Sequence, residues 1–209
     1  MVPVVRSIFA SWCRLWPLAL CLAFPCPPVS AEAIGMLQAP TRLGLAVGAG
    51  AAWYEDPAGP TRGGILRARY ALRLERDLAP AWRGSLTAAL SVARWPADTR
   101  RIGADGQGYE LAAGMARRLG PVGRGLWLGA ALRGGVTRLR NRHTVDAAGY
   151  LLNRWPDRQG AGLGLDLGVA ADRVLRPGWR AGWHLLLQHR LAGTGFDRFV
   201  LAFSLYPVP

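Results

Sequence analysis

Hydrophobic and polar residues alternate with a period of two along much of the chain. In the segment ILRARYALRLE, residues 65–75, one parity is apolar: Leu66, Ala68, Tyr70, Leu72 and Leu74. The other parity carries the charges: Arg67, Arg69, Ala71, Arg73 and Glu75. A helix turns by about 100° per residue and would mix both kinds on one face, whereas a strand separates them. The segment is therefore predicted to be a β-strand.

Seven further segments alternate in the same way, near residues 43–51, 86–92, 109–116, 126–133, 160–169, 179–188 and 198–206. The connections between the segments also alternate in length. Long links occupy residues 55–64, 94–108 and 141–159, and short turns occupy residues 78–81, 120–125 and 176–178. The last link, residues 192–197, is short although it falls on the long side. Long loops at one end and tight turns at the other are typical of outer-membrane barrels. We therefore predict an all-β fold, an eight-stranded antiparallel up-and-down transmembrane β-barrel.

The composition of the polar parity indicates which face lies inside. A soluble, periplasmic, lipocalin-like ligand-binding barrel also alternates, but its exterior carries dense mixed charge. Here the polar parity is mostly Gly, Ala, Ser and Thr, which suits the narrow lumen of an eight-stranded barrel. We expect a plugged interior in which arginines pair with acids: Arg67, Arg69, Arg73, Arg83, Arg133, Arg180 and Arg198 with Glu75, Glu110, Asp166 and Asp172. The soluble barrel stays open as an alternative.

Aromatic residues gather near the ends of the predicted strands. Membrane barrels carry girdles of such residues at both bilayer interfaces. The sequence therefore predicts interfacial aromatic residues at six positions: Trp53, Trp82, Trp95, Tyr109, Trp179 and Tyr206.

The N-terminal segment has the features of an export signal. Arg6 and Arg14 precede an uncharged run, residues 15–24, and Val29-Ser30-Ala31 forms a small-x-small cleavage site. The run is shorter than the roughly 20 apolar residues of a transmembrane helix. We predict a signal peptide at residues 1–31 and one barrel domain at residues 32–209. All cysteines precede residue 32, so the mature domain has no thiol for a disulfide or a metal.

The charge balance points to anionic partners. The chain holds 26 basic residues against 13 acidic ones, a net charge of +13, and every basic residue is arginine. Because an exported chain rarely meets nucleic acid, we expect outer-membrane lipids and lipopolysaccharide as partners in a Gram-negative organism. In the basic run RLRNRH, Arg138, Arg140 and Arg142 are candidate ligands for lipid phosphates, since guanidinium forks bind phosphate. The alternative for this run is a solvated rim.

No cofactor and no metal site are predicted. The glycines of GLGLDLG, residues 162–168, have strand spacing, and no helix start follows to hold a phosphate. The histidines are scattered, and His184 and His189 have opposite parity on one predicted strand, so they do not share one ion.

The segment WHLLLQHRLAGTGFDRFVLAFSLY, residues 183–206, resembles the C-terminal hairpin of the lipid A 3-O-deacylases. These are outer-membrane acyloxyacyl hydrolases built on an eight-stranded barrel, with a His-x-Ser-Asn-Ala-Gly type motif. Gln188, His189, Ala192 and Gly193 match the outline of that motif. The resemblance implies an outward histidine near the outer leaflet, oriented by a carboxylate from a loop.

One position departs from the family. Leu191 stands where the family has its serine nucleophile, and ester cleavage by this route needs a hydroxyl within reach of its base. Under this alternative the catalytic residues would be His189, Thr194 and Asp197, with Thr194 as the substitute nucleophile and Asp197 as the orienting acid. Two functions follow from the sequence: a non-enzymatic surface or lipopolysaccharide-interacting barrel, and a lipid A ester hydrolase or its inactive descendant.

The C-terminus also departs from a common pattern. Outer-membrane barrels resemble one another in ending on an aromatic residue that the barrel assembly machinery reads, whereas this chain ends in proline. Tyr206 or Phe203 is then the candidate for that signal. We expect a monomer.

Overall fold

The computed structural model describes residues 41–54, 62–96, 103–119, 125–141, 144–145, 151–153 and 157–207. The barrel belongs to a compact unit spanning Met36–Pro209. The predicted signal peptide, residues 1–31, lies outside the described residues, and so do Arg142 and His143. Within the described residues, no helix has the length and hydropathy needed to cross a membrane.

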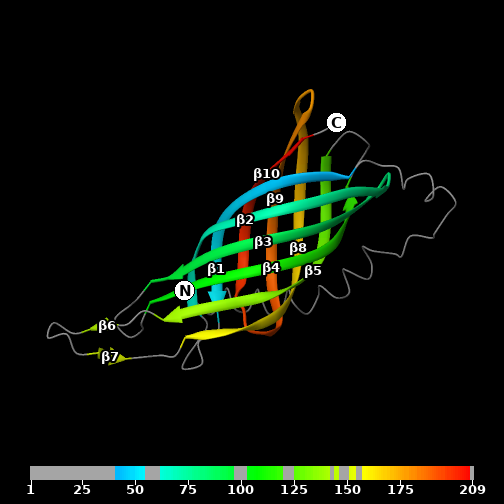
Figure 1. Ribbon diagram of the computed structural model, residues 1–209. Coiled ribbons are helices and arrows are strands. Elements are labelled where there is room, and N and C mark those ends of the chain that lie inside the picture. Colours follow the sequence, from blue (N-terminus) through cyan, green and yellow to red (C-terminus); the bar gives the residue numbers. More distant parts are fainter. Residues whose placement is uncertain are drawn as a thin grey trace. The chain divides into compact units, whose positions relative to one another are not determined.

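Eight long strands form one closed barrel in the order β1-β10-β9-β8-β5-β4-β3-β2 (Figure 1). Every neighbouring pair is antiparallel. The barrel strands are β1 Arg42–Tyr54, β2 Arg62–Ala79, β3 Trp82–Trp95, β4 Ala104–Arg118, β5 Gly125–Asn141, β8 Arg158–Arg176, β9 Trp179–Gly193 and β10 Asp197–Pro207. Two short strands, β6 Thr144–Val145 and β7 Leu151–Asn153, pair with each other only. The predicted fold is confirmed.

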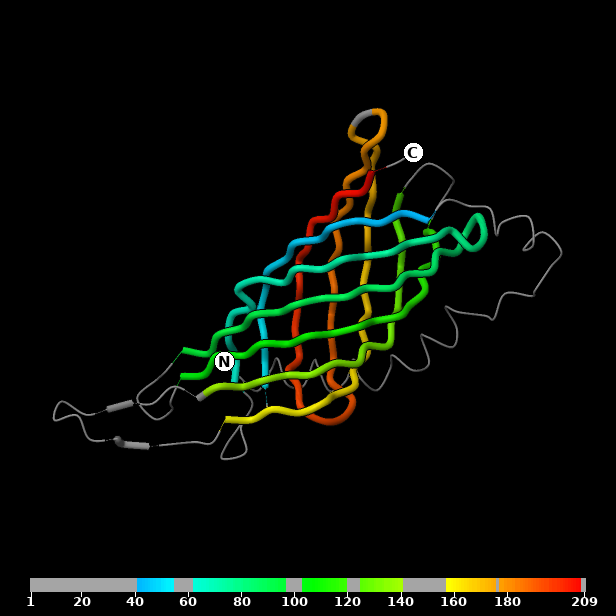
Figure 2. Tube along the Cα trace, in the orientation of Figure 1, coloured from blue at the N-terminus to red at the C-terminus, as the bar shows by residue number. Residues whose placement is uncertain are grey.

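The strands run strongly tilted around the barrel, and consecutive strands neighbour each other throughout (Figure 2). Short turns join β2 to β3 and β8 to β9, and the long link between β5 and β8 contains β6 and β7. The barrel is therefore of the up-and-down type, because each barrel strand pairs with the barrel strand that follows it in the sequence. The end with the short turns is called the inner end here, and the opposite end is the outer end.

The outward face of the barrel is apolar. Leu45, Leu111 and Leu132 are each more than 60% exposed, although they are among the most hydrophobic residues of their strands. Their strand neighbours on the other parity are buried and charged, for example Glu110 and Arg133. Since a soluble protein would reverse this arrangement, the apolar face is a lipid-facing surface and the soluble alternative is excluded.

A β-bulge in β2 reverses one part of the predicted face assignment. In the pairing with β1, Gly48 lies opposite Arg69 and Gly50 opposite Leu66, so β2 carries one extra residue there. Pairing with β3 is irregular at the same place. As a result Leu66 is fully buried and Arg67 is exposed on the outer surface, the opposite of the prediction. An inserted residue shifts the period of two by one, which turns the preceding side chains to the other face.

Two of the six predicted interfacial aromatic residues point into the lumen instead. Trp95 is fully buried and stacks edge-on against Tyr54 and Phe196, with ring centroids 4.8 and 5.2 Å away. Tyr206 is also buried, and its hydroxyl donates a hydrogen bond to Glu75 Oε1 at 3.3 Å. Both residues have inward parity, and strand parity decides the face whatever the position along the strand. Tyr109, in contrast, is exposed on the outside as predicted.

Candidate functional site

The first candidate site lies on the outer face of β5, near its outer end. Arg138 and Arg140 are both exposed. Leu139 between them and Thr137 before them are buried in the lumen. Val136, the preceding outward residue, belongs to the apolar face and is 42% exposed. The two arginines therefore stand directly beyond the lipid-facing surface, on the side of the long loops.

Another exposed arginine, Arg158 at the start of β8, pairs with the buried Leu139, so it lies on the lumen side of the barrel wall and not beside Arg138 and Arg140. From the sequence, Arg158 is predicted to lie in the long link, because the alternation that marks β8 begins only after it. In the structure, pairing with β5 extends β8 to residue 158.

The second candidate site joins β9 to β10. His189 Nδ1 lies 3.3 Å from Asp197 Oδ1, without the geometry of a hydrogen bond, and both side chains are about one third exposed. The same carboxylate oxygen accepts a hydrogen bond of 2.7 Å from the backbone N–H of Arg190. The structure thus brings together the histidine and the acid that the sequence had paired.

Thr194 does not join this pair. Its backbone N–H donates to Ala161 O at 2.9 Å, and its side chain lies over Gly160 on β8, where a Cβ would collide with it. A bulge in β9 at Leu191 and a left-handed Gly193, with φ of 74°, shape this turn. Leu191 itself is 56% exposed. Of the three predicted catalytic residues, the structure assembles two.

The lumen holds two groups of ion pairs. In the outer cluster, Glu110 binds Arg198 and Arg133, the latter at 3.3 Å, and Asp166 binds Arg133 at 2.8 Å. Gln188 also donates to Asp166, at 2.6 Å.

The inner cluster joins three acids to four arginines. Glu75 pairs with Arg73 at 2.7 Å and with Arg83 at 3.3 Å. The remaining pairs are Asp77 with Arg42 and Arg83, and Asp172 with Arg83 and Arg180. Six of the seven arginines predicted to lie inside do so, and Arg67 is the exception because of the bulge.

A serine and a histidine also lie within hydrogen-bond distance inside the barrel, but the histidine nitrogen that faces the serine carries a proton and cannot accept one. Ser204 Oγ lies 2.7 Å from His184 Nε2, and Arg73 Nη1 lies 2.9 Å from His184 Nδ1. Arginine only donates, so Nδ1 accepts and the neutral ring carries its proton on Nε2. Ser204 in turn donates to Gly182 O at 3.2 Å. A nucleophilic serine needs a histidine that accepts its proton, and His184 does not.

No protein-family model matches the sequence. A search of curated proteins finds no match either. Among solved structures, Ail, the attachment invasion locus protein of Yersinia pestis, in complex with the heparin analogue sucrose octasulfate, aligns with a TM-score of 0.49 and 12% identity over 80% of this chain and 96% of that chain. Neisserial surface protein A aligns with a TM-score of 0.47 and 11% identity over 80% and 98%. The outer membrane enzyme PagL aligns with a TM-score of 0.36 and 12% identity over 77% and 97%.

The strand pairing of this chain itself establishes the fold. Spanning a bilayer with strands requires a closed barrel, because no backbone N–H or C=O group can remain unpaired in hydrocarbon. Eight antiparallel strands, an apolar exterior and a polar, filled interior meet that requirement. The chain is an outer-membrane β-barrel protein.

Proposed function

We propose that this barrel is a non-enzymatic outer-membrane protein that holds phosphate groups of lipopolysaccharide with Arg138 and Arg140. The observation that carries the proposal is the exposure of both arginine residues directly beyond the apolar face, at the end of the barrel with the long loops. Alternate residues of a strand lie roughly 7 Å apart, so both side chains can reach phosphates of one headgroup region. Arginine binds phosphate through paired N–H donors, which suits this role.

The proposal includes Arg142, which continues the same spacing in the sequence. It also includes a monomeric barrel that is inserted by the barrel assembly machinery. Of the two candidate aromatic signals, Phe203 is exposed on the outer face, whereas Tyr206 is buried in the lumen. Phe203 is therefore the better candidate for recognition from outside the barrel.

Replacing Arg138 and Arg140 together by glutamine is expected to weaken binding of bisphosphorylated lipid A at least about tenfold, because each charge-assisted hydrogen bond contributes about 1.5–3 kcal/mol. Binding would be measured by titration of lipid A into the refolded barrel in zwitterionic detergent. Arg173→Gln is the matched control, since Arg173 is also an exposed arginine but lies near the inner end of β8. Equal binding by the double variant, or equal binding of dephosphorylated lipid A, would contradict the proposal.

A second candidate function is hydrolysis of an acyl ester of lipid A. The approach of His189 Nδ1 to Asp197 Oδ1, at 3.3 Å on the outer side of β9, favours it. In this reaction water is consumed, the ester C–O bond breaks, and a fatty acid and a sugar hydroxyl are released. Thr194 would have to leave Gly160 before its hydroxyl could meet His189.

Mass spectrometry of lipid A from cells with and without the protein separates the two functions. The hydrolase predicts loss of one ester-linked acyl chain, which His189→Ala should abolish because no base remains. Thr194→Ala tests the nucleophile, and Thr87→Ala is the control because Thr87 lies in the lumen. An unchanged spectrum would exclude the hydrolase and leave the phosphate-binding proposal standing.

A further inference from the structure

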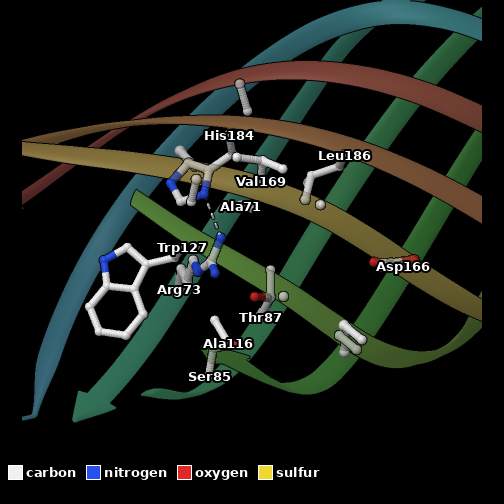
Figure 3. A pocket seen from close by; sticks show the side chains of 18 of the residues that line it. Ala71, Arg73, Ser85, Thr87, Ala116, Trp127, Asp166, Val169, His184 and Leu186 are labelled. Atoms are coloured by element: carbon white, nitrogen blue, oxygen red, sulfur yellow. Dashed lines mark hydrogen bonds between the residues drawn. The ribbon is translucent and has the colours of Figure 1, made fainter. Parts of the chain in front are cut away.

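A cavity of about 60 Å³ lies in the lumen between the outer and the inner cluster. Small side chains form most of its wall, and Arg69, Arg73, Ser85 and Thr87 contribute polar groups to it. Figure 3 shows Arg73 hydrogen-bonded to His184 at one side, with Thr87 and Ser85 near Arg73. Since a buried water needs about 10–15 Å³ by this measure, the cavity has room for a small ion and a few waters.

The charges around the cavity do not balance. In the outer cluster, Glu110 and Asp166 face Arg133 and Arg198, and Arg69 adds a third positive charge to these two acids. The inner cluster holds four arginines against three acids. Counted over these residues, each cluster therefore has one positive charge in excess, and Asp197, which also acts on Arg133, is partly exposed at the outer end. Burying an unpaired charge is costly, so a counter-ion between the clusters would stabilise the fold.

Arg69 is the residue that most clearly lacks a counter-ion. Only 4% of it is exposed, and its Nε has no hydrogen-bond partner. Among the residues that the structure describes, no carboxylate lies within ion-pair distance of its guanidinium group. The carboxylates nearest in the network, Glu110 and Asp166, are already engaged by Arg133 and Arg198. Arg69 therefore lines the cavity with guanidinium N–H donors that can bind a ligand there.

We propose that the lumen binds a small inorganic anion of the size of chloride in this cavity, between Arg69 and Arg73. The hydroxyl groups of Ser85 and Thr87 can donate further hydrogen bonds to it. Asp166 also lines the cavity, but its charge is covered by Arg133 and Gln188 at 2.8 and 2.6 Å. The site is independent of the outward arginines and would serve to hold the two clusters together.

Thermal unfolding of the refolded barrel tests the site. The protein is prepared in sodium gluconate, and chloride or bromide then replaces gluconate at constant ionic strength. We expect the Tm to rise by about 3–5 °C for each tenfold increase of halide above its Kd, as linkage requires for a ligand of the native state. Gluconate is too large for the cavity, so ionic strength alone would give no such rise.

Arg69→Met removes the guanidinium group and keeps an unbranched side chain about as long as the arginine stem, and it should abolish the halide dependence. Arg173→Gln, an exposed arginine outside the lumen, should leave it unchanged. If Arg69→Met does not fold, crystals of the unaltered barrel soaked in bromide decide the matter by anomalous scattering at the cavity. A Tm that is equal in chloride and gluconate, a halide dependence that persists in Arg69→Met, or the absence of a bromide peak between Arg69 and Arg73 would overturn the proposal.

Discussion

Glu110→Gln is expected to lower the free energy of unfolding by about 3–5 kcal/mol, the usual loss when one partner of a buried ion pair is removed. Glu110 is 6% exposed, and its Oε1 binds both Arg133 and Arg198. Arg198 is the more affected of the two, because it is 1% exposed and has no other carboxylate partner among the described residues. The change therefore leaves a buried guanidinium without a counter-charge. Urea unfolding of the barrel in phospholipid vesicles would measure the loss.

Asp77→Asn provides the matched control for this prediction. Asp77 also pairs with two arginines, Arg42 at 2.8 Å and Arg83 at 2.9 Å, but its side chain is 32% exposed at the inner end. Partly exposed pairs contribute about 0–1 kcal/mol, since water replaces the lost partner. We therefore expect a loss several times smaller than for Glu110→Gln. Equal losses in the two variants would contradict the prediction. They would show that burial does not increase the contribution of the Glu110 ion pairs to the free energy of unfolding.

Trp95→Ala is the second change with a large expected effect, a loss of about 3–5 kcal/mol in the free energy of unfolding. Trp95 is fully buried at the centre of an apolar group near the outer end of the lumen, between Tyr54 and Phe196. Its removal leaves a large cavity that the rigid barrel wall cannot close. Trp95→Phe should cost much less, because it keeps most of the ring and removes an indole N–H that has no hydrogen-bond partner.

Gly106 gives this prediction a sharper test. A Cβ at Gly106 would lie 2.7 Å from the Trp95 ring, so Gly106→Ala should destabilise the native barrel. In the Trp95→Ala background the ring is absent, and the same substitution should be tolerated. A double-mutant cycle measures this coupling directly. Additive effects of the two changes would mean that Trp95 does not fill the space that Gly106 leaves.

Most of the strand pattern followed from the sequence because alternation is a local property. Leu111 and Glu110, or Leu132 and Arg133, are neighbours in the chain, and a strand turns neighbours to opposite faces whatever surrounds it. The link lengths then determined the up-and-down order. The pair His189 and Asp197 could also be predicted from the sequence, because a short turn joins their two strands. The position of Thr194 could not be predicted, because its contact with Gly160 depends on how that turn packs against β8.

The sequence by itself determined the class of fold, the lipid-facing parity of each regular strand and the arginine-rich lumen. Only the tertiary structure decided the outward position of Arg67, because the bulge in β2 arises from pairing with β1 and β3. It also decided which acid each arginine meets. Glu110 and Arg198 are 88 residues apart, and closure of the barrel alone brings them together. Periodicity fixes the face of a residue, whereas strand register and ring closure fix its partners.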